Sequence, residues 1–308
     1  MESKEQQSIP EGLQKNPLRR MMMLRFAGLG DAVFVNTVAY HYWKSSCKKV
    51  ILAGNYPEIF RGNPGAIVLP TTSQRISHQL GRLLCSLGLV DRMVYMGYQP
   101  EGKGTSMKPM EKHILDALGE KVGLSTMPLK PLIFLGEQEI ADAKLPAGKG
   151  PWVAMHSSGI TEMTENKNWY PERFHELAKR VKGMGCRVVQ LGRKSDPSLD
   201  ADMDLRDKVS PRCAAAVLAA CKLLVCQEGY LMHAATAVGT TAVVIYGGFI
   251  APWESGYDQN INLFTKMPCS PCWLREPCPY DKECMKQINA DMVAQKITDI
   301  LNKWNHNI

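Results

Sequence analysis

The chain of 308 residues has no run that approaches the roughly 20 consecutive apolar residues that a membrane-spanning helix needs. It also has no block of lysines and arginines and no zinc-finger or RNA-binding signature. Its net charge of +7 is modest and is spread along the sequence. Such a charge fits an anionic substrate or an anionic membrane surface, and we expect no nucleic-acid partner.

The first 20 residues, MESKEQQSIPEGLQKNPLRR, lack the apolar centre of a secretory signal. They are polar and carry charges of both signs, and the apolar run that follows them is too short to supply such a centre. From these features we expect a flexible tail at residues 1–20. We also expect a cytoplasmic protein, whose basic charge would allow peripheral contact with the anionic inner membrane.

The rest of the chain is long enough for two domains, and its 45% apolar and 22% charged residues are typical of a globular protein. Strand-like and helix-like segments alternate from MMMLRF (residues 21–26) onwards, and PLIFL (131–135) is expected to be a short strand. After the Pro- and Gly-rich segment at 145–151 the pattern restarts with WVAMH (152–156). The pattern predicts an α/β protein with two parallel-sheet domains, at residues 21–146 and 147–308.

The stretch from residue 223 to residue 257 is the most informative part of the chain. LLVC (223–226) and TAVVIYG (241–247) are short apolar runs of the kind that forms strands buried on both faces. Glu228 and Gly229 follow the first strand and begin the helix that carries His233. Ligands of open α/β sheets bind at this edge, and the free N–H groups of a helix start favour an anion. The stretch therefore predicts a ligand site with a place for phosphate.

Each polar residue of this stretch has two interpretations. Glu228 can accept hydrogen bonds from sugar hydroxyls, while the backbone N–H groups of Gly229 and Tyr230 hold a phosphate and His233 lines the pocket. Alternatively, Glu228 only caps the helix and His233 is a core histidine. The residues alone leave both interpretations open.

The Gly28-Leu29-Gly30-Asp31 segment follows the first expected strand. A dinucleotide fingerprint would need Gly or Ala at position 33, where the chain has valine, which argues against an NAD site. Asp31 is either a helix cap or a carboxylate that takes a proton from an acceptor hydroxyl.

Lys167 begins the segment Lys-Asn-Trp-Tyr-Pro that precedes an expected helix. Its ammonium group could neutralise a diphosphate leaving group. Alternatively it is a solvated surface lysine, as most lysines are, and Trp169 and Pro171 simply pack the helix start.

Four of the ten cysteines form a cluster with the spacing C-x2-C-x5-C-x5-C and interleaved prolines. Four thiolates at such spacing predict a structural zinc or iron site, because they leave no open coordination position for catalysis. Disulfides or free thiols are the alternatives, and a cytoplasmic location argues against disulfides. The cluster consists of Cys269, Cys272, Cys278 and Cys284.

With these residues placed, the chain resembles glycosyltransferase family 9, which includes the ADP-heptose heptosyltransferases of lipopolysaccharide assembly. The resemblance covers most of residues 21–300. Gly30-Asp31 matches a Gly-Asp turn whose aspartate is the proposed catalytic base of the family. Lys167 and Trp169 match a Lys-x-Trp-Pro-like stretch that contacts the donor phosphates, although Tyr170 is inserted before the proline.

The resemblance continues in the second half of the chain. Glu228 and His233 fit the ends of an Asp-x-Gly-x-x-His-like segment that holds the donor, with Tyr230 in place of the central glycine. The turn at residues 246–248 matches a Phe-Gly-Pro-like turn of the family. Cysteine clusters are common after this turn, and related protein heptosyltransferases carry a four-cysteine iron site.

The resemblance implies a GT-B fold, in which two Rossmann-like domains face each other across a cleft. The amino-terminal domain would bind the acceptor and the carboxyl-terminal domain the donor. It also implies an inverting transfer without a catalytic metal, with Asp31 and Lys167 as catalytic residues. The expected donor-binding residues are Ser157, Ser158, Lys167, Gly192, Glu228, Gly229, Tyr230, His233, Gly247 and Gly248.

The resulting hypothesis is an inverting glycosyltransferase that moves a heptose from a nucleotide sugar, with ADP-heptose as the first expectation. The acceptor would be a hydroxyl of a lipopolysaccharide or surface glycan precursor, or of a protein. One rival is a sugar-nucleotide epimerase of the GT-B fold. The other is a non-catalytic, metal-stabilised family member that acts as a scaffold.

Overall fold

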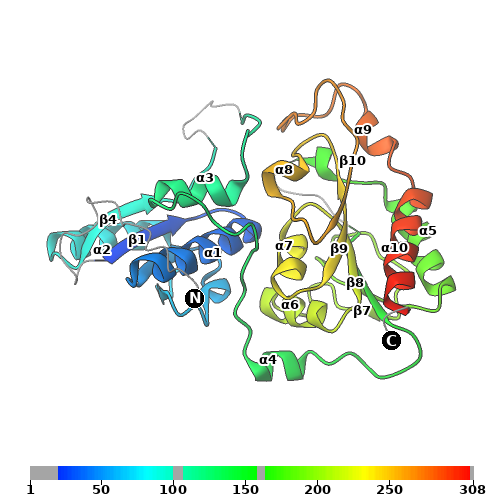
Figure 1. Ribbon diagram of the computed structural model, residues 1–308, viewed down its shortest axis with the longest axis horizontal. Coiled ribbons are helices and arrows are strands. Elements are labelled where there is room, and N and C mark those ends of the chain that lie inside the picture. Colours follow the sequence, from blue (N-terminus) through cyan, green and yellow to red (C-terminus); the bar gives the residue numbers. More distant parts are fainter. Residues whose placement is uncertain (1–19, 100–106, 158–163, 306–308) are drawn as a thin grey trace, which may run out of the picture. The chain divides into compact units, whose positions relative to one another are not determined.

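The computed structural model describes residues 20–99, 107–157 and 164–305 (Figure 1). The chain divides into two compact units. Among the described residues, the first unit comprises 20–98 and 115–128, and the second comprises 99, 107–114 and the rest of the chain from 129.

The first unit is built on a parallel sheet of four strands in the order β3-β2-β1-β4. One of its two inner strands, β1, is mostly methionine and leucine, and Met22, Met23 and Leu24 are completely buried. Burial on both faces explains why this strand reads as a continuous apolar run. The elements of the unit are β1 (Arg20–Arg25), α1 (Leu29–Ser46), β2 (Val50–Gly54), the short helix η2 (Pro57–Phe60), β3 (Ala66–Val68), α2 (Gln74–Ser86), β4 (Val90–Tyr95) and α3 (Ile114–Lys121).

The second unit is built on a parallel sheet of six strands in the order β10-β9-β8-β5-β6-β7. In chain order the strands run outwards in one direction from β5 and in the other from β8, which is the doubly wound arrangement of Rossmann-like domains. The strands are β5 (Trp152–Met155), β6 (Arg187–Gln190), β7 (Met203–Asp204), β8 (Leu223–Gln227), β9 (Thr241–Tyr246) and β10 (Ile261–Phe264).

Helices cover both faces of this second sheet. In Figure 1, α5 and α10 lie on one side of the strands and α6 and α7 on the other. Prolines open α5 and α6 at their first positions, and the Ser210 hydroxyl caps α6 by accepting from the N–H of Cys213, as the sequence predicts. The helices are α4 (Glu137–Asp142), the short helix η3 (Glu165–Lys167), α5 (Pro171–Gly183), α6 (Pro211–Ala219), α7 (Tyr230–Ala237), α8 (Pro252–Ser255), α9 (Glu283–Lys286) and α10 (Ala290–Asn305).

The prediction of an α/β protein with two parallel sheets is confirmed. The strand predicted at residues 131–135 is wrong, because this apolar segment forms no strand. It runs instead past the start of α6, where the Arg212 guanidinium donates to the carbonyl oxygen of Phe134 at 2.5 Å.

The division between the units differs from the boundary expected at residue 146. Arg212, only 3% exposed, donates to both carboxylate oxygens of Glu139 at 2.6 and 2.5 Å and thereby fixes α4 to the second unit. The carboxylate of Glu254 accepts the N–H of Met110 at 2.6 Å, which fixes residues 107–114 to the same unit. The Pro- and Gly-rich segment at 145–151 therefore lies within the second unit.

In the described part of the chain, no helix combines the length and the apolar character needed to cross a lipid bilayer.

Candidate active site

The order of the second sheet defines where a ligand site is expected. The strand order reverses between β5 and β8, which pair in register through Met155 and Val225. Open α/β sheets bind ligands at the carboxyl ends of the strands at such a point. The residues that follow these two strands are His156 and Ser157 after β5, and Glu228 and Gly229 after β8.

Lys167 and Glu228 form an ion pair beside this edge of the sheet. Their side chains are 17% and 8% exposed, and the Lys167 ammonium also lies 5.6 Å from the ring centre of Phe249. The side-chain amide of Gln227, at the end of β8, donates to the carbonyl oxygen of Lys167 and holds the lysine backbone there. Lys167 is therefore not a solvated surface lysine, and the two predicted residues lie together.

Two groups besides Lys167 contact the Glu228 carboxylate. Ser255 hydrogen-bonds to it, and Nε2 of His233 lies 3.8 Å from its Oε1. Burial alone would raise the pKa of Glu228, but Lys167, His233 and the hydrogen bonds from Lys167 and Ser255 hold that pKa below its usual value. Glu228 is thus a buried carboxylate in its charged form, rather than only the cap of a helix.

Tyr257 joins this cluster through His233, although no pattern in the sequence predicts a role for it. Its phenol oxygen lies 2.7 Å from Nδ1 of His233, and the two rings meet edge to face with centres 5.7 Å apart. Both side chains are nearly fully buried, at 3% and 2% exposure. Ser255 is the last residue of α8, and Tyr257 follows it after Gly256. The signal available in the sequence was that both residues follow the predicted glycine turn at residues 246–248.

The start of α7 offers backbone N–H groups next to Glu228. Gly229 precedes the helix, and the helix begins at Tyr230. The phenol of Tyr230 donates to the carbonyl oxygen of Pro211 at 2.7 Å, so its side chain packs at the start of α6. The predicted contribution of Tyr230 to a phosphate site is therefore that of its backbone N–H.

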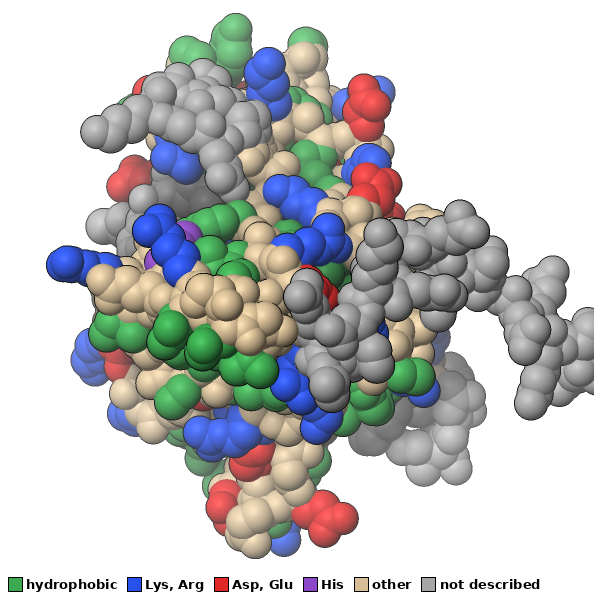
Figure 2. Space-filling view, turned by 90° about the vertical axis from the view of Figure 1, so that its left-hand side faces the viewer, with side chains coloured by type: hydrophobic (Ala, Val, Ile, Leu, Met, Phe, Trp, Pro, Cys, Tyr) green, Lys and Arg blue, Asp and Glu red, His purple; other side chains and the backbone are tan. Residues whose placement is uncertain are grey.

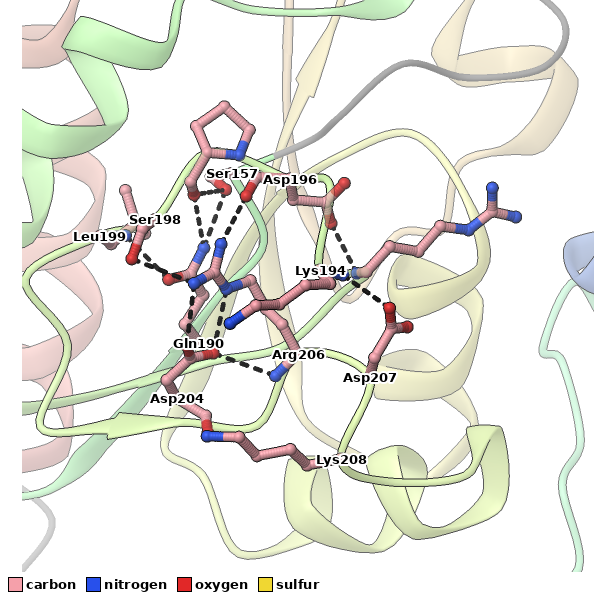
Figure 3. Close-up of polar contacts among 12 residues, drawn as sticks. Ser157, Gln190, Lys194, Asp196, Ser198, Leu199, Asp204, Arg206, Asp207 and Lys208 are labelled. Carbon is pink, nitrogen blue, oxygen red and sulfur yellow. Dashed lines mark hydrogen bonds and ion pairs between the residues drawn. The ribbon is translucent and has the colours of Figure 1, made fainter.

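Ser157 has a different environment from the one predicted. It is completely buried, its hydroxyl donates to the carbonyl oxygen of Pro197 at 2.6 Å, and it accepts from the side-chain amide of Gln190 at 3.0 Å (Figure 3). A hydroxyl that is used in this way joins the loops after β5 and β6 to each other. The second predicted serine, Ser158, lies outside the described residues.

Gly192 lies two residues after the end of β6. Its backbone has a φ of +132°, a conformation that favours glycine. A Cβ atom at this position would collide with the Asp196 carboxylate and lie 2.8 Å from the His156 ring. The absence of a side chain at Gly192 thus allows Nε2 of His156 to donate to Asp196 at 3.1 Å. Burial raises the pKa of Asp196, but the bonds from His156 and the Arg193 N–H outweigh it and lower the pKa.

A second polar cluster centres on Arg206, whose side chain is 5% exposed (Figure 3). Its guanidinium donates to both oxygens of Asp204, at 3.0 and 2.8 Å. It also donates to the Ser198 hydroxyl at 3.0 Å and to the carbonyl oxygen of Asp196 at 2.5 Å. Hydrogen bonds from Arg206 hold the pKa of Asp204 far below its usual value. These bonds fix the loop between β6 and α6.

The predicted donor turn at Gly247 and Gly248 packs against the cysteine segment. The N–H of Gly248 donates to Sγ of Cys284 at 3.1 Å, and its carbonyl oxygen accepts the N–H of Cys272 at 2.6 Å. A Cβ on Gly247 would meet the side chain of Met285 at 2.5 Å. Glycine at these positions therefore permits the close approach of the cysteine segment to the end of β9.

The four clustered cysteines are free thiols in the structure. Burial raises the pKa of the Cys272 and Cys284 thiols, and the neighbouring cysteines add to this effect. Within the described ranges, however, no three or more His, Cys, Asp or Glu side chains are arranged to hold a metal ion. The metal site predicted from the spacing stays a prediction.

Asp31 lies in the first unit, at the third position of α1. Its Oδ2 accepts the N–H of Gly28 at 3.0 Å, which completes a capping interaction, and its Oδ1 accepts from Arg25 at 2.7 Å. The guanidinium of Arg25 also lies 5.1 Å from the ring centre of Tyr98. The N-cap residue is therefore Gly28 rather than Asp31, and Asp31, with a side chain 12% exposed, supports the cap from the third helical position. Its role as a base stays a prediction.

Comparison with known proteins adds three findings. The family model described as "Glycosyltransferase family 9 (heptosyltransferase)" matches residues 107–283. No curated protein matches the chain. Solved structures, in contrast, match along almost its whole length, at low sequence identity.

Three of these structures illustrate the likeness. A family 9 glycosyl transferase from Veillonella parvula is 15% identical, with a TM-score of 0.70 over 93% of this chain and 98% of its own. The E. coli ADP-heptose lps heptosyltransferase II is 15% identical, with a TM-score of 0.67 over 93% and 99%. The dodecameric iron-containing heptosyltransferase TibC, in complex with ADP-D-beta-D-heptose, is 14% identical, with a TM-score of 0.70 over 93% and 77%. The likeness shows that the chain has the GT-B-like fold of these proteins.

Proposed function

The chain belongs to glycosyltransferase family 9, and from this premise we propose that it transfers a heptose from ADP-heptose to a hydroxyl acceptor with inversion at the anomeric carbon. The family description and the ADP-heptose named for two of the similar structures support this donor. The observation that carries the proposal is the partly buried Lys167–Glu228 ion pair at the switch point of the second sheet. The family match does not favour an epimerase or a scaffold.

The pair suits a nucleotide sugar because it contains both signs of charge. The Lys167 ammonium would stabilise the negative charge that grows on the departing diphosphate, together with the N–H groups at the start of α7. The Glu228 carboxylate would accept hydrogen bonds from hydroxyl groups of the donor. In the structure each group neutralises the other, so that neither charge is left unpaired.

Asp31 would take the proton from the attacking hydroxyl. A hydroxyl whose pKa lies far above 7 needs a base as it attacks the anomeric carbon. Arg25 and the N–H of Gly28 hold the Asp31 carboxylate in one orientation, as a positioned base requires. Asp31→Asn removes this base and keeps the side-chain volume. We therefore expect turnover to fall by about 100-fold or more, while the affinity for the nucleotide stays unchanged.

The acceptor and the location of the reaction complete the proposal. We propose a lipopolysaccharide or surface glycan precursor as acceptor, with a protein as the alternative, and a cytoplasmic enzyme that is peripheral at the inner membrane. The net charge of +7 supports attraction to an anionic surface. Transfer assays with lipid-linked glycan and with protein acceptors would separate the two.

The donor is tested first by thermal shift against ADP, UDP, GDP and ADP-heptose. A ligand at about 100 times its Kd adds about 2.7 kcal/mol of stability. We expect ADP and ADP-heptose to raise the Tm of the wild type, with a smaller rise for Lys167→Ala and an unchanged rise for the exposed-lysine control Lys179→Ala. A shift with another nucleotide alone would overturn the ADP-heptose assignment.

We also propose a structural zinc or iron ion at Cys269, Cys272, Cys278 and Cys284. Their spacing, their free thiols and the iron named for the similar TibC structure support it. No step of the reaction depends on this ion. Elemental analysis of purified protein tests the proposal, because less than about a tenth of an equivalent of zinc plus iron would remove it.

A further inference from the structure

The segment at residues 255–257, where α8 ends, touches the proposed donor site at two points. Ser255 hydrogen-bonds to the Glu228 carboxylate. Two residues later, the phenol of Tyr257 meets Nδ1 of His233 at 2.7 Å. Since Nε2 of the same imidazole ring lies 3.8 Å from Oε1 of Glu228, the tyrosine reaches the carboxylate through the histidine.

The charge of Glu228 decides how the proton on His233 is placed. A ring nitrogen with a lone pair facing a carboxylate is repelled, whereas an N–H is attracted. Nε2 therefore carries hydrogen, and in the neutral ring Nδ1 is left as an acceptor. The phenol of Tyr257 can donate to it, because burial raises the pKa of Tyr257 well above its usual value and keeps its hydrogen in place.

The Tyr257 ring is itself held in place. The ring of His113 packs against it with centres 5.7 Å apart, and Nε2 of His113 donates to the carbonyl oxygen of Gly256 at 3.1 Å. Tyr257 is 3% exposed and His113 is 4% exposed. A phenol fixed in this way can hold its partner in one orientation.

We propose that Tyr257 is a positioning residue of the donor site, which fixes the ring and tautomer of His233 so that Nε2–H faces Glu228 and keeps that carboxylate directed at Lys167. The inference rests on the proposed function, because it assigns Glu228 and Lys167 to the nucleotide sugar. In this proposal Tyr257 acts through His233 rather than by contact with the donor.

The test replaces Tyr257 by phenylalanine, which removes the hydroxyl and keeps the ring. We expect the KM for ADP-heptose to rise by about 3- to 10-fold, the range that corresponds to the loss of one hydrogen bond, with a smaller change in kcat. The full-length protein, labelled with ¹⁵N in its seven histidines, reports the tautomer directly. In the wild type, His233 should show one protonated and one unprotonated ring nitrogen, and Tyr257→Phe should change this pattern.

Tyr42→Phe is the matched control. Tyr42 is also a nearly buried tyrosine, at 5% exposure, but it lies in α1 of the first unit. The Tyr42→Phe substitution should leave both the His233 signals and the KM unchanged. Its effect on Tm measures how much stability is lost when a buried tyrosine hydroxyl is removed elsewhere in the protein.

Two outcomes would overturn the inference. One is an unchanged His233 pattern in Tyr257→Phe, and the other is a KM that changes no more than in Tyr42→Phe. A wild type that binds and transfers no nucleotide sugar would contradict the proposed function instead. In that case the ring-nitrogen signals still decide whether Tyr257 sets the tautomer of His233.

Discussion

Two polar clusters lie at the carboxyl edge of the second sheet, and they differ in how their charges are used. In the cluster around Arg206, the guanidinium meets two carboxylate oxygens, a hydroxyl and a carbonyl oxygen within one loop. In the cluster around Glu228, one partly buried lysine faces one carboxylate that is 8% exposed, next to a helix start. The hydrogen bonds of the first cluster satisfy its own groups, whereas the second cluster holds the two charges that we propose bind the donor. Polar residues at a ligand edge are thus structural or functional according to their partners.

The largest effect should follow from breaking the second cluster at Lys167. In Lys167→Ala the diphosphate loses its cationic partner, so we expect kcat/KM to fall by about 100- to 1,000-fold. Steady-state kinetics with ADP-heptose would measure this, with Lys179→Ala as the control for loss of an exposed lysine. A decrease of less than about 10-fold would place the phosphates elsewhere.

Breaking the first cluster should affect stability rather than chemistry. Arg206→Met removes the charge from a nearly buried position and leaves the Asp204 carboxylate without its main partner. We expect the free energy of unfolding to fall by about 2–4 kcal/mol in urea titrations. The KM of the folded fraction for the donor should stay within about twofold of the wild type. A large rise in KM without loss of stability would reverse the assignment of this cluster.

The pH dependence of stability should have opposite signs at two buried glutamates. Glu228 has a lowered pKa, so its stabilising effect is complete above its usual value of about 4.5 and is lost as the pH falls through the folded-state value. Burial raises the pKa of Glu254, so stability decreases as the pH rises from about 4.5 through its folded-state value.

Urea unfolding between pH 3.5 and 8 would detect both effects. The stability advantage of the wild type over Glu228→Gln should shrink towards the acid end. For Glu254→Gln, the free energy of unfolding of the variant should increase relative to that of the wild type towards the alkaline end. The same slope in both variants would show that the assigned directions are wrong.

The smallest effect is expected at Ser157, where sequence and structure differ. Ser157→Ala removes a hydroxyl that bridges Gln190 and the carbonyl oxygen of Pro197, so the free energy of unfolding should fall by about 1–2 kcal/mol. The thermal shift caused by ADP should be the same as in the wild type. A reduced ADP shift in this variant would restore the donor-binding role that the sequence predicts.

Much of the fold could be predicted from local patterns. The apolar runs gave the strands β5, β8 and β9, and prolines at first helical positions marked α5 and α6. The apolar segment 131–135 was misleading, because an apolar run can also pack without forming a strand. Strand β7, only two residues long, is too short to leave a periodic pattern.

The candidate site was predictable as residue types but not as contacts. Lys167 and Glu228 belong to different segments, and only the parallel sheet brings them together. The bond between Tyr257 and His233 spans 24 positions and depends on the segment that follows α8, whose sequence carries no common signature. Conversely, the residues next to Ser157 in the chain do not show that its hydroxyl donates to the carbonyl oxygen of Pro197, 40 positions away.

The path of the chain has a consequence for dissecting the protein. Residues 107–114 belong to the second unit, but along the chain they stand between two pieces of the first. A fragment that starts at residue 129 would expose the surface of α8 and leave Oε1 of Glu254 without the Met110 N–H. The second unit therefore cannot be cut out as one continuous piece without residues 115–128 of the first. A fragment or a circular permutant that is meant to contain the complete second unit must include residues 107–114.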